Sequence, residues 1–310
     1  MKKIAYTIIV LFLIVLLAIL AMRRSDIPLE ELKRTYTNEH SKFIKIDGMD
    51  VHYQDEGTGI PLVLIHGVGS SLNTWDGWAG QLKNDFRIIR LDLPGFALTG
   101  PHPNKDYSID FYASFMKTFL DTLQIDSCYM AGNSLGGYIT WNVAAAYPDF
   151  VKRMILLDAA GYPLEDTIPY VFTVAQSSIV PLFNKMTPRF LVAQILNEVY
   201  GDDSKVTDEI VDRYYYHALR EGNRDAFLSV VKTLDFKDYQ KLKTIETPAL
   251  LMWGEKDKWI DLKQAKRFNK DLPHSELIVY PGVGHIPMEE LPIETARDAK
   301  RFLLGLSDTL

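Results

Sequence analysis

The chain has 310 residues, 47% of them hydrophobic, which is enough for one large core and a small accessory domain. Its 34 basic and 40 acidic residues give a formal charge of −6, which argues against nucleic acid or another polyanion as a partner. Cys128 is the only cysteine, and this excludes a disulfide framework and a cysteine-rich zinc site.

The N-terminus carries an uncharged apolar run from Ile4 to Met22, with lysines before it and Arg23 and Arg24 after it. Its length is close to the ~20 residues that a helix needs to cross a bilayer. The end of the run lacks the small residues of a signal-peptide cleavage site. We therefore expect a single-pass membrane anchor over residues 1–24 and a polar spacer over 25–42. Basic residues flank both ends of the run, so the side of the membrane that the catalytic domain faces stays open.

Short apolar segments then alternate with helix-like ones. The strand-like segments are 61–65, 86–91, 128–131, 151–158, 248–253 and 276–280. This alternation predicts a mostly parallel sheet with helices on both faces. Residues 43–46 and 51–53, separated by Asp47-Gly48, predict an antiparallel hairpin that opens the sheet.

The most informative motif is Gly132-Asn133-Ser134-Leu135-Gly136, which reads G-x-S-x-G between a predicted strand and a predicted helix. This pattern places a serine on a strained strand-to-helix turn. Glycines suit the turn because they carry no Cβ where two backbones approach closely. A serine so placed can act as a nucleophile, provided that a base and oxyanion donors lie beside it.

With these motifs the chain resembles the α/β-hydrolases. The resemblance implies a mostly parallel eight-stranded sheet flanked by helices, with a helical cap inserted after the sixth strand. It places the core at residues 43–161 and 247–310 and the cap at 162–246. Members of the family order their catalytic triad as serine, acid and histidine, each on a loop after a strand. Ser134, Asp257 and His285 match that order.

The resemblance also implies the role of each residue. His285 would be the general base and then the general acid, while Asp257 would hold its tautomer and offset the imidazolium charge. The oxyanion hole would be formed by the backbone N–H groups of Val68 and Leu135. The resemblance implies no cofactor and no metal.

Other polar residues have structural interpretations. Asp158 follows a predicted strand and is the rival candidate for the acid of the triad. His66 belongs to the oxyanion loop and is expected to form a structural hydrogen bond. Asp92 is expected to fix the turn before Pro94, and Glu290 is expected to be structural.

The residues from Gly284 to Met288 resemble those of membrane-associated lipases and esterases, including monoacylglycerol-lipase-like enzymes. Together with the anchor and apolar cap residues between Ile168 and Phe183, this predicts a carboxylester hydrolase for lipid-derived or acylglycerol esters, working through an acyl-enzyme. One alternative is a carbon–carbon bond hydrolase of ring-cleavage diketones, because such enzymes often carry the G-N-S-x-G-G of residues 132–137. They usually place a tryptophan where this chain has Ile286. A further alternative is a non-catalytic binding protein with a hydrolase fold.

Overall fold

The computed structural model describes residues 3, 6–7, 9–11, 13, 22–163, 170–175, 177 and 185–306. In this part of the chain eight strands form one sheet in the order β1-β2-β4-β3-β5-β6-β7-β8. The strands are β1 (Ser41–Ile46), β2 (Met49–Glu56), β3 (Pro61–Ile65), β4 (Arg87–Leu91), β5 (Cys128–Asn133), β6 (Val151–Leu157), β7 (Ala249–Gly254) and β8 (Ser275–Tyr280). β1 and β2 form the expected antiparallel hairpin, β2 is also antiparallel to β4, and the other neighbours are parallel. The predicted mostly parallel eight-stranded sheet is confirmed.

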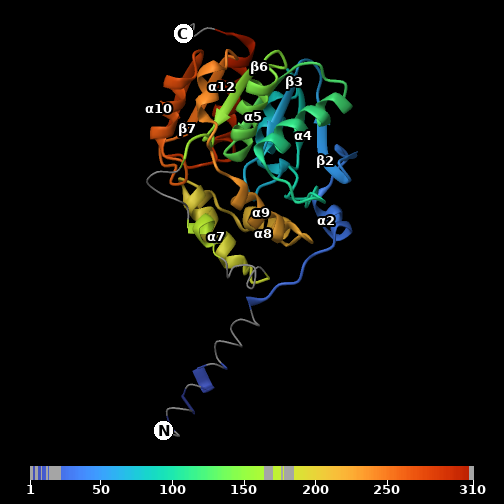
Figure 1. The fold of residues 1–310 in the computed structure, drawn as a ribbon, viewed down its shortest axis with the longest axis vertical. Helices are drawn as coiled ribbons and strands as arrows, with labels where there is room; N and C mark the ends of the chain where they lie inside the picture. The colour runs from blue at the N-terminus through green and yellow to red at the C-terminus, as the bar shows by residue number, and fades with distance from the viewer. Residues whose placement is uncertain are drawn as a thin grey trace.

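Helices cover both faces of this sheet (Figure 1). The core helices are α3 (Asp76–Leu82), α4 (Ile109–Thr122), α5 (Leu135–Ala146), α10 (Leu262–Asp271), α11 (Pro287–Glu290) and α12 (Pro292–Leu304). Successive residues of a strand point to opposite faces. In β3, accordingly, Val63 and Ile65 pack in the core that α4, α5 and α10 share, whereas Leu62 and Leu64 pack with α3 and α12.

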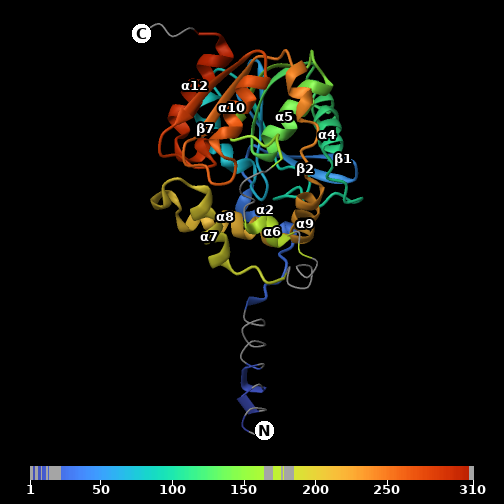
Figure 2. The same cartoon turned by 60° about the vertical axis from the view of Figure 1, so that its left-hand side comes forward.

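The cap lies between β6 and β7, as expected, and sits at one end of the sheet (Figures 1 and 2). Its helices are α6 (Tyr170–Ala175), α7 (Arg189–Val199), α8 (Asp208–Leu219) and α9 (Asn223–Thr233). Short 3-10 helices are found at Leu72–Trp75, Asp203–Lys205 and Tyr239–Thr244. Much of the predicted apolar cap face lies outside the described residues, namely 164–169, 176 and 178–184.

The segment N-terminal to β1 differs from the expected spacer. It contains helix α2 (Leu29–Tyr36), whose Leu32 is buried, and both views show α2 beside the cap helices (Figures 1 and 2). Within the described residues, no helix has the length and apolar composition needed to cross a membrane. On that finding the predicted membrane anchor and membrane partner are wrong; most of residues 1–24 lie outside the described part. The domain boundaries stay predictions.

Candidate active site

Ser134 occupies the turn between β5 and α5, where the backbone reverses from strand to helix. Its φ of 54° and ψ of −114° lie outside the regions that L-residues usually adopt. The turn is held by main-chain bonds, because the Ser134 N–H donates to the Leu157 carbonyl at 3.1 Å and its own carbonyl accepts from Tyr138 and Ala160. The serine side chain is therefore presented at the end of the sheet that faces the cap.

The two outer glycines of the motif are required by close backbone contacts. A Cβ on Gly132 would lie 2.1 Å from the carbonyl oxygen of Gly136. A Cβ on Gly136 would lie 2.1 Å from the carbonyl oxygen of Ile65 in the neighbouring strand. Real side chains never approach a backbone oxygen so closely, so only glycine permits this turn to pack on β3.

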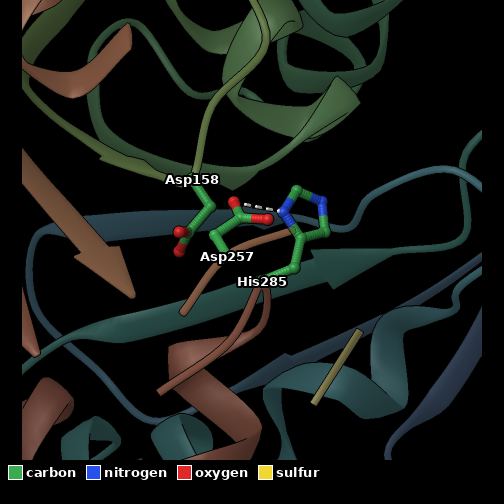
Figure 3. A group of neighbouring side chains, drawn as sticks. All are labelled: Asp158, Asp257 and His285. Atoms are coloured by element: carbon green, nitrogen blue, oxygen red, sulfur yellow. Dashed lines mark hydrogen bonds and ion pairs between the residues drawn. The ribbon is translucent and has the colours of Figure 1, made fainter. Parts of the chain in front are cut away.

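Asp257 and His285 lie on the loops after β7 and β8 and contact each other directly (Figure 3). Asp257 Oδ2 is 2.8 Å from His285 Nδ1, and both side chains are buried. The other carboxylate oxygen accepts from the backbone N–H groups of Trp259 and Ile260 at 2.7 and 3.0 Å. These bonds fix the carboxylate, which in turn orients the imidazole and directs its Nε2 away from Asp257.

Ser134 and His285 line the same cavity. Both residues are among those that the structure describes, and no hydrogen bond joins their side chains there. In ligand-free hydrolases such contacts often tighten only when substrate binds. The structure thus brings the three predicted triad residues to one site, and their catalytic roles stay a prediction.

Asp158, the rival acid, lies behind Asp257 rather than against the imidazole (Figure 3). It is fully buried; its Oδ1 accepts from the Gly254 N–H at 2.9 Å, and its Oδ2 has no hydrogen-bond partner. Burial, and then the charge on Asp257, raise the pKa of Asp158 well above its ordinary value. Burial therefore disfavours the charged form of Asp158, and Asp257 is the carboxylate that contacts His285 directly.

The carboxylates of Asp158 and Asp257 and the ring of His285 each offer an atom within 4.8 Å of the others, a spacing that invites comparison with a metal site. The 2.8 Å between Asp257 and His285 is the length of a direct hydrogen bond. Two ligands of a tetrahedral zinc ion stand about 3.3 Å apart. The geometry therefore fits a hydrogen-bonded pair of Asp257 and His285 with the buried carboxyl of Asp158 behind it.

The predicted oxyanion donors lie beside the serine. Val68, Leu135 and Ser134 line one cavity in common, and Leu135 is the first residue of α5, where backbone N–H groups have no partner within the helix. His66 fixes the loop that carries Val68, since its Nε2 accepts from the Leu93 N–H at 2.9 Å and its Nδ1 donates to the Gly67 carbonyl at 2.7 Å. Burial lowers the pKa of His66, which keeps the ring neutral.

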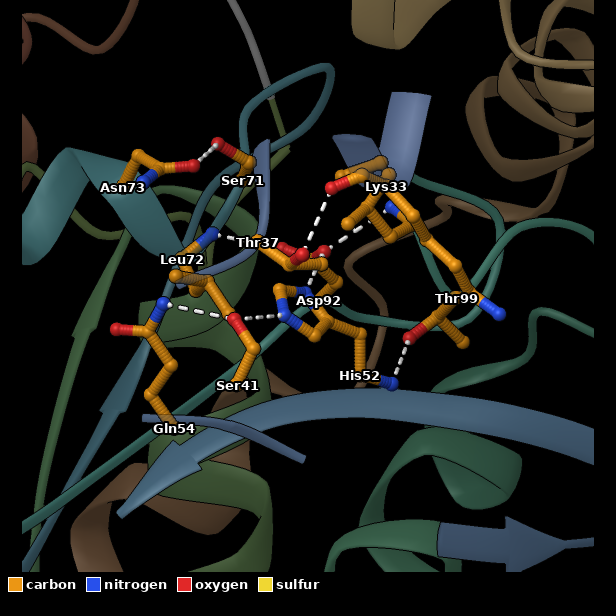
Figure 4. Close-up of polar contacts among 12 residues, drawn as sticks. Lys33, Thr37, Ser41, His52, Gln54, Ser71, Leu72, Asn73, Asp92 and Thr99 are labelled. Atoms are coloured by element: carbon orange, nitrogen blue, oxygen red, sulfur yellow. Dashed lines mark hydrogen bonds and ion pairs between the residues drawn. The ribbon is translucent and has the colours of Figure 1, made fainter. Parts of the chain in front are cut away.

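Asp92 joins strand β2 to the loops after β3 and β4 (Figure 4). Its carboxylate is 2.8 Å from His52 Nδ1 and accepts from the N–H groups of Leu72 and Leu98 at 2.8 and 3.0 Å. His52 Nε2 in turn contacts Ser41 Oγ at 3.0 Å. Burial alone would raise the pKa of Asp92, but the neighbouring His52 lowers it to about 2. Asp92 thus remains charged and holds the loops after β3 and β4 together, a larger role than the single turn predicted for it.

Ser134 stands where two cavities meet. The larger, of about 370 Å³, also contacts His285 and the cap helices, and most of its lining is apolar. The smaller, of about 220 Å³, is lined by Phe172, Leu234 and Phe236 among other residues. Val68, Ser134 and Trp259 line both. A substrate whose reacting carbon carries a substituent on each side could therefore extend from the serine into both cavities.

Two residues on the core side of the site carry positioning contacts that the sequence left unassigned or only coarsely assigned. Asn133 Nδ2 donates to the His285 carbonyl at 2.9 Å and to the Leu157 carbonyl at 3.1 Å, which ties the serine turn to the histidine loop. Glu290, expected to be structural, accepts from the N–H groups of Gly284 at 2.7 Å and Gly201 at 3.0 Å. Asn133 is the first x of G-x-S-x-G, a position that accepts any residue, so the motif gave no reason to predict a positioning role for it.

Three cap residues of the larger cavity had no sequence signal. His217, Asn223 and Arg224 line it and are buried, and each has a side-chain atom without a hydrogen-bond partner. Burial lowers the pKa of His217 to about 4, so its ring is neutral near pH 7. The otherwise apolar cavity thus has a polar end.

Comparison with known proteins identifies the family. The sequence pattern of the alpha/beta hydrolase fold matches residues 60–292. The chain belongs to this family. A 2-hydroxy-6-oxo-2,4-heptadienoate hydrolase of Pseudomonas putida is 28% identical over 260 residues, which cover 80% of this chain and 90% of that protein.

Solved structures agree on the fold. A variant of the meta-cleavage product hydrolase CumD from Pseudomonas fluorescens IP01, complexed with acetates, superimposes with a TM-score of 0.76 at 26% identity, over 86% of this chain and 98% of that one. A membrane phospholipase A described as a bacterial virulence factor matches over all of both chains, with a TM-score of 0.72 and 24% identity. At that identity the second likeness shows the fold alone.

These relatives correct the predicted function. The chain is a hydrolase, as expected, but the prediction of a membrane-anchored carboxylester hydrolase for lipid-derived esters is wrong. The relatives that match it over most of their length include dienoate and meta-cleavage product hydrolases, and these favour the carbon–carbon hydrolase alternative that residues 132–137 had suggested.

Proposed function

We propose that the protein hydrolyses a carbon–carbon bond in a 2-hydroxy-6-oxo-dienoate, the type of compound that opening of an aromatic ring produces. The observation that carries the proposal is the similarity to the dienoate hydrolase of Pseudomonas putida across 90% of that enzyme's length. The position of Ser134 between two cavities supports it, because the ketone of such a substrate has a carbon substituent on each side.

The proposed reaction requires a nucleophile, a base and oxyanion donors, and the site contains a candidate for each. In its diketone tautomer the substrate can release a carbanion from C5, because the charge is delocalised through the double bond onto the C2 carbonyl. Ser134 would attack the C6 carbonyl while His285 takes the serine proton. The backbone N–H groups of Val68 and Leu135 would hold the C6 oxyanion.

Collapse of that oxyanion breaks the C5–C6 bond. His285 returns its proton to C5, which releases 2-hydroxypenta-2,4-dienoate after enolisation and leaves an acyl group on Ser134. Water, deprotonated by His285, then cleaves the acyl ester and gives the carboxylic acid. Asp257 would stabilise the imidazolium in both stages, and the sum of the steps adds one water molecule across the broken bond.

The test is the loss of dienoate absorbance with 2-hydroxy-6-oxo-2,4-heptadienoate as substrate. Wild type and Ser114→Ala, which removes an exposed serine hydroxyl of α4, should both consume it. Ser134→Ala should lose activity by about 10³-fold or more. Consumption of the dienoate by Ser134→Ala at the wild-type rate would refute the nucleophile, and no consumption by wild type would refute the proposed reaction.

A further inference from the structure

Glu289 lies on α11, directly after the histidine loop, and joins the core to the cap. Its side chain is only 7% exposed, and its carboxylate accepts several hydrogen bonds. From the core, Thr74 Oγ1 donates to Oε1. From the cap, Tyr200 and Arg213 donate to Oε2 at 2.7 and 2.6 Å, and Tyr214 donates to Oε1 at 3.0 Å. The histidine loop and two parts of the cap therefore meet at one buried carboxylate.

This cluster fixes the orientation of Tyr214 on α8. Although burial alone would lower it, the Glu289 carboxylate raises the pKa of Arg213, so the guanidinium stays charged. The guanidinium carbon lies 5.2 Å from the centroid of the Tyr214 ring, within reach of a cation–π contact. Burial, and then the charge of Glu289, raise the pKa of Tyr214, so its hydroxyl keeps its proton and donates it to Glu289. The phenolic oxygen is left as an acceptor for another donor.

The donor to this oxygen is the hydroxyl of Ser70, at 3.2 Å. Ser70 is the last residue of the oxyanion loop, which begins at Gly67. Its backbone N–H donates to the Gly67 carbonyl at 3.3 Å, which closes a tight turn around Val68. The direction of the Val68 N–H, the predicted oxyanion donor, therefore depends on how the two ends of the turn are held. The ring of His66 holds the first end, and Tyr214 holds the last.

We propose that Tyr214, held by Glu289, is a positioning residue for the oxyanion loop. Through Ser70 its hydroxyl aims the Val68 N–H at the oxygen of the carbonyl under attack. The cap, which carries Tyr214 on α8 at the end of the sheet where the site lies, thus supports the oxyanion hole as well as lining the cavity (Figures 1 and 2). Cleavage of a dienoate as the reaction so assisted rests on the proposed function, whereas the support applies to any carbonyl that Ser134 attacks.

Phosphonylation of Ser134 tests the proposal without the dienoate. An alkyl fluorophosphonate forms an O–P bond with the serine and releases fluoride, while His285 takes the serine proton; its phosphoryl oxygen needs the same N–H donors. The final extent of labelling counts the correctly folded sites, whereas the rate constant reports how reactive each site is. Tyr214→Phe should lower the rate constant by about 10-fold and leave the extent near that of wild type. Ser134→Ala should not be labelled.

The expected factor is smaller than the loss of an oxyanion donor would give. Removal of such a donor costs about 10²- to 10³-fold, but in Tyr214→Phe the Val68 N–H remains and is only less well aimed. With the dienoate, Tyr214→Phe should lower kcat and kcat/KM by the same factor, because the oxyanion forms only as the carbonyl is attacked. A higher KM with an unchanged kcat would mean that Tyr214 binds the substrate, and it would overturn the positioning role.

A double-mutant cycle tests whether Tyr214 acts through Ser70. Ser70→Ala removes the other hydroxyl of the same hydrogen bond, so it should lower the labelling rate constant by a similar factor. The double variant should then be no slower than the slower single variant, to within about twofold. If the two factors multiply in the double variant, the residues act independently and the proposal fails.

Tyr280→Phe is the matched control for the loss of a buried tyrosine hydroxyl. Tyr280 is 6% exposed, and its hydroxyl donates to Asp298 Oδ2 at 3.0 Å, between β8 and α12. Neither residue is among those that line the two cavities at Ser134. This variant should have a lower melting temperature and the labelling rate constant of wild type. An equal fall of the rate constant in Tyr280→Phe and Tyr214→Phe would overturn the proposal.

The remaining outcomes separate this proposal from the proposed function. If Ser134 is labelled at a rate that depends on Tyr214 while wild type leaves the dienoate intact, only the proposed function has failed. An unchanged rate constant in Tyr214→Phe would overturn the positioning role for any substrate. No labelling of Ser134 in wild type would overturn it as well, because there would be no working oxyanion hole to support.

Discussion

His217 gives the most quantitative prediction, because its environment strongly disfavours the charged ring. The side chain is 3% exposed, and burial lowers its pKa from 6.5 to about 4, with Asp92 opposing the change and Arg213 adding to it. The other neighbours are His52, His66 and the ring of Tyr36, whose centroid lies 4.4 Å away. The folded protein therefore holds His217 neutral at a pH where the unfolded chain would protonate it.

The sign of the effect follows from proton binding. Between about pH 6.5 and pH 4 the unfolded state binds more protons than the folded state, so the free energy of unfolding falls as the pH falls. A shift from 6.5 to about 4 corresponds to about 3 kcal/mol once the pH is below both values. Between pH 7 and pH 5 the loss should be about 2 kcal/mol.

The variant His217→Gln removes this titration and keeps a polar side chain. Its stability should fall about 2 kcal/mol less than that of wild type between pH 7 and pH 5. Urea unfolding followed by tryptophan fluorescence at pH 5, 6, 7 and 8 measures the difference. Values at pH 7 and pH 8 serve as the control, because there His217 is largely neutral in both states. If the two proteins lose stability in parallel down to pH 5, His217 does not have the lowered pKa that its burial implies.

Three further predictions follow from the site. Gly136→Ala should lower the free energy of unfolding by about 3 kcal/mol or more and abolish activity. Gly80→Ala is its control: a Cβ there meets no atom within 4 Å, so this change should stabilise α3 by up to about 1 kcal/mol. Similar urea midpoints for the two variants would contradict the close approach of Gly136 to β3. Asp158→Asn imitates the neutral form of the acid and does not titrate. Because the raised pKa of Asp158 makes wild type lose stability as the pH rises, melting curves should show the variant gaining stability relative to wild type from pH 4 to pH 7. A constant difference between the two proteins would mean that the pKa of Asp158 is not raised. Asn133→Ala should lower kcat for the dienoate by about 10- to 100-fold, because the histidine loop loses its tie to the serine turn; an unchanged kcat would remove Asn133 from the positioning residues.

Local patterns were sufficient to predict the sheet and the positions of the candidate triad. β3 is a continuous apolar run, and the β1–β2 hairpin has Asp47 and Gly48 at its turn, both with positive φ in the structure. Each motif residue follows a strand in the expected chain order. Such features depend on neighbours in the sequence, and one chain is enough to reveal them.

The contacts that shape the cavity depend instead on residues far apart in the chain. Asp26 and Arg224 are separated by 198 positions, and nothing around either residue indicates the other. His217 occupies a cap helix with no motif, and its neutral state comes from burial that only the assembled fold provides. The ester prediction relied on residues beside His285 and on the N-terminal apolar run, and the comparison with known hydrolases overturned it.

The most direct test of the account is product analysis of wild-type enzyme with 2-hydroxy-6-oxo-2,4-heptadienoate in ¹⁸O-labelled water. The account predicts equimolar acetate and 2-hydroxypenta-2,4-dienoate, with the label in the acetate, and no such products from Ser134→Ala. Recovery of intact dienoate after prolonged incubation with folded wild-type protein would contradict it.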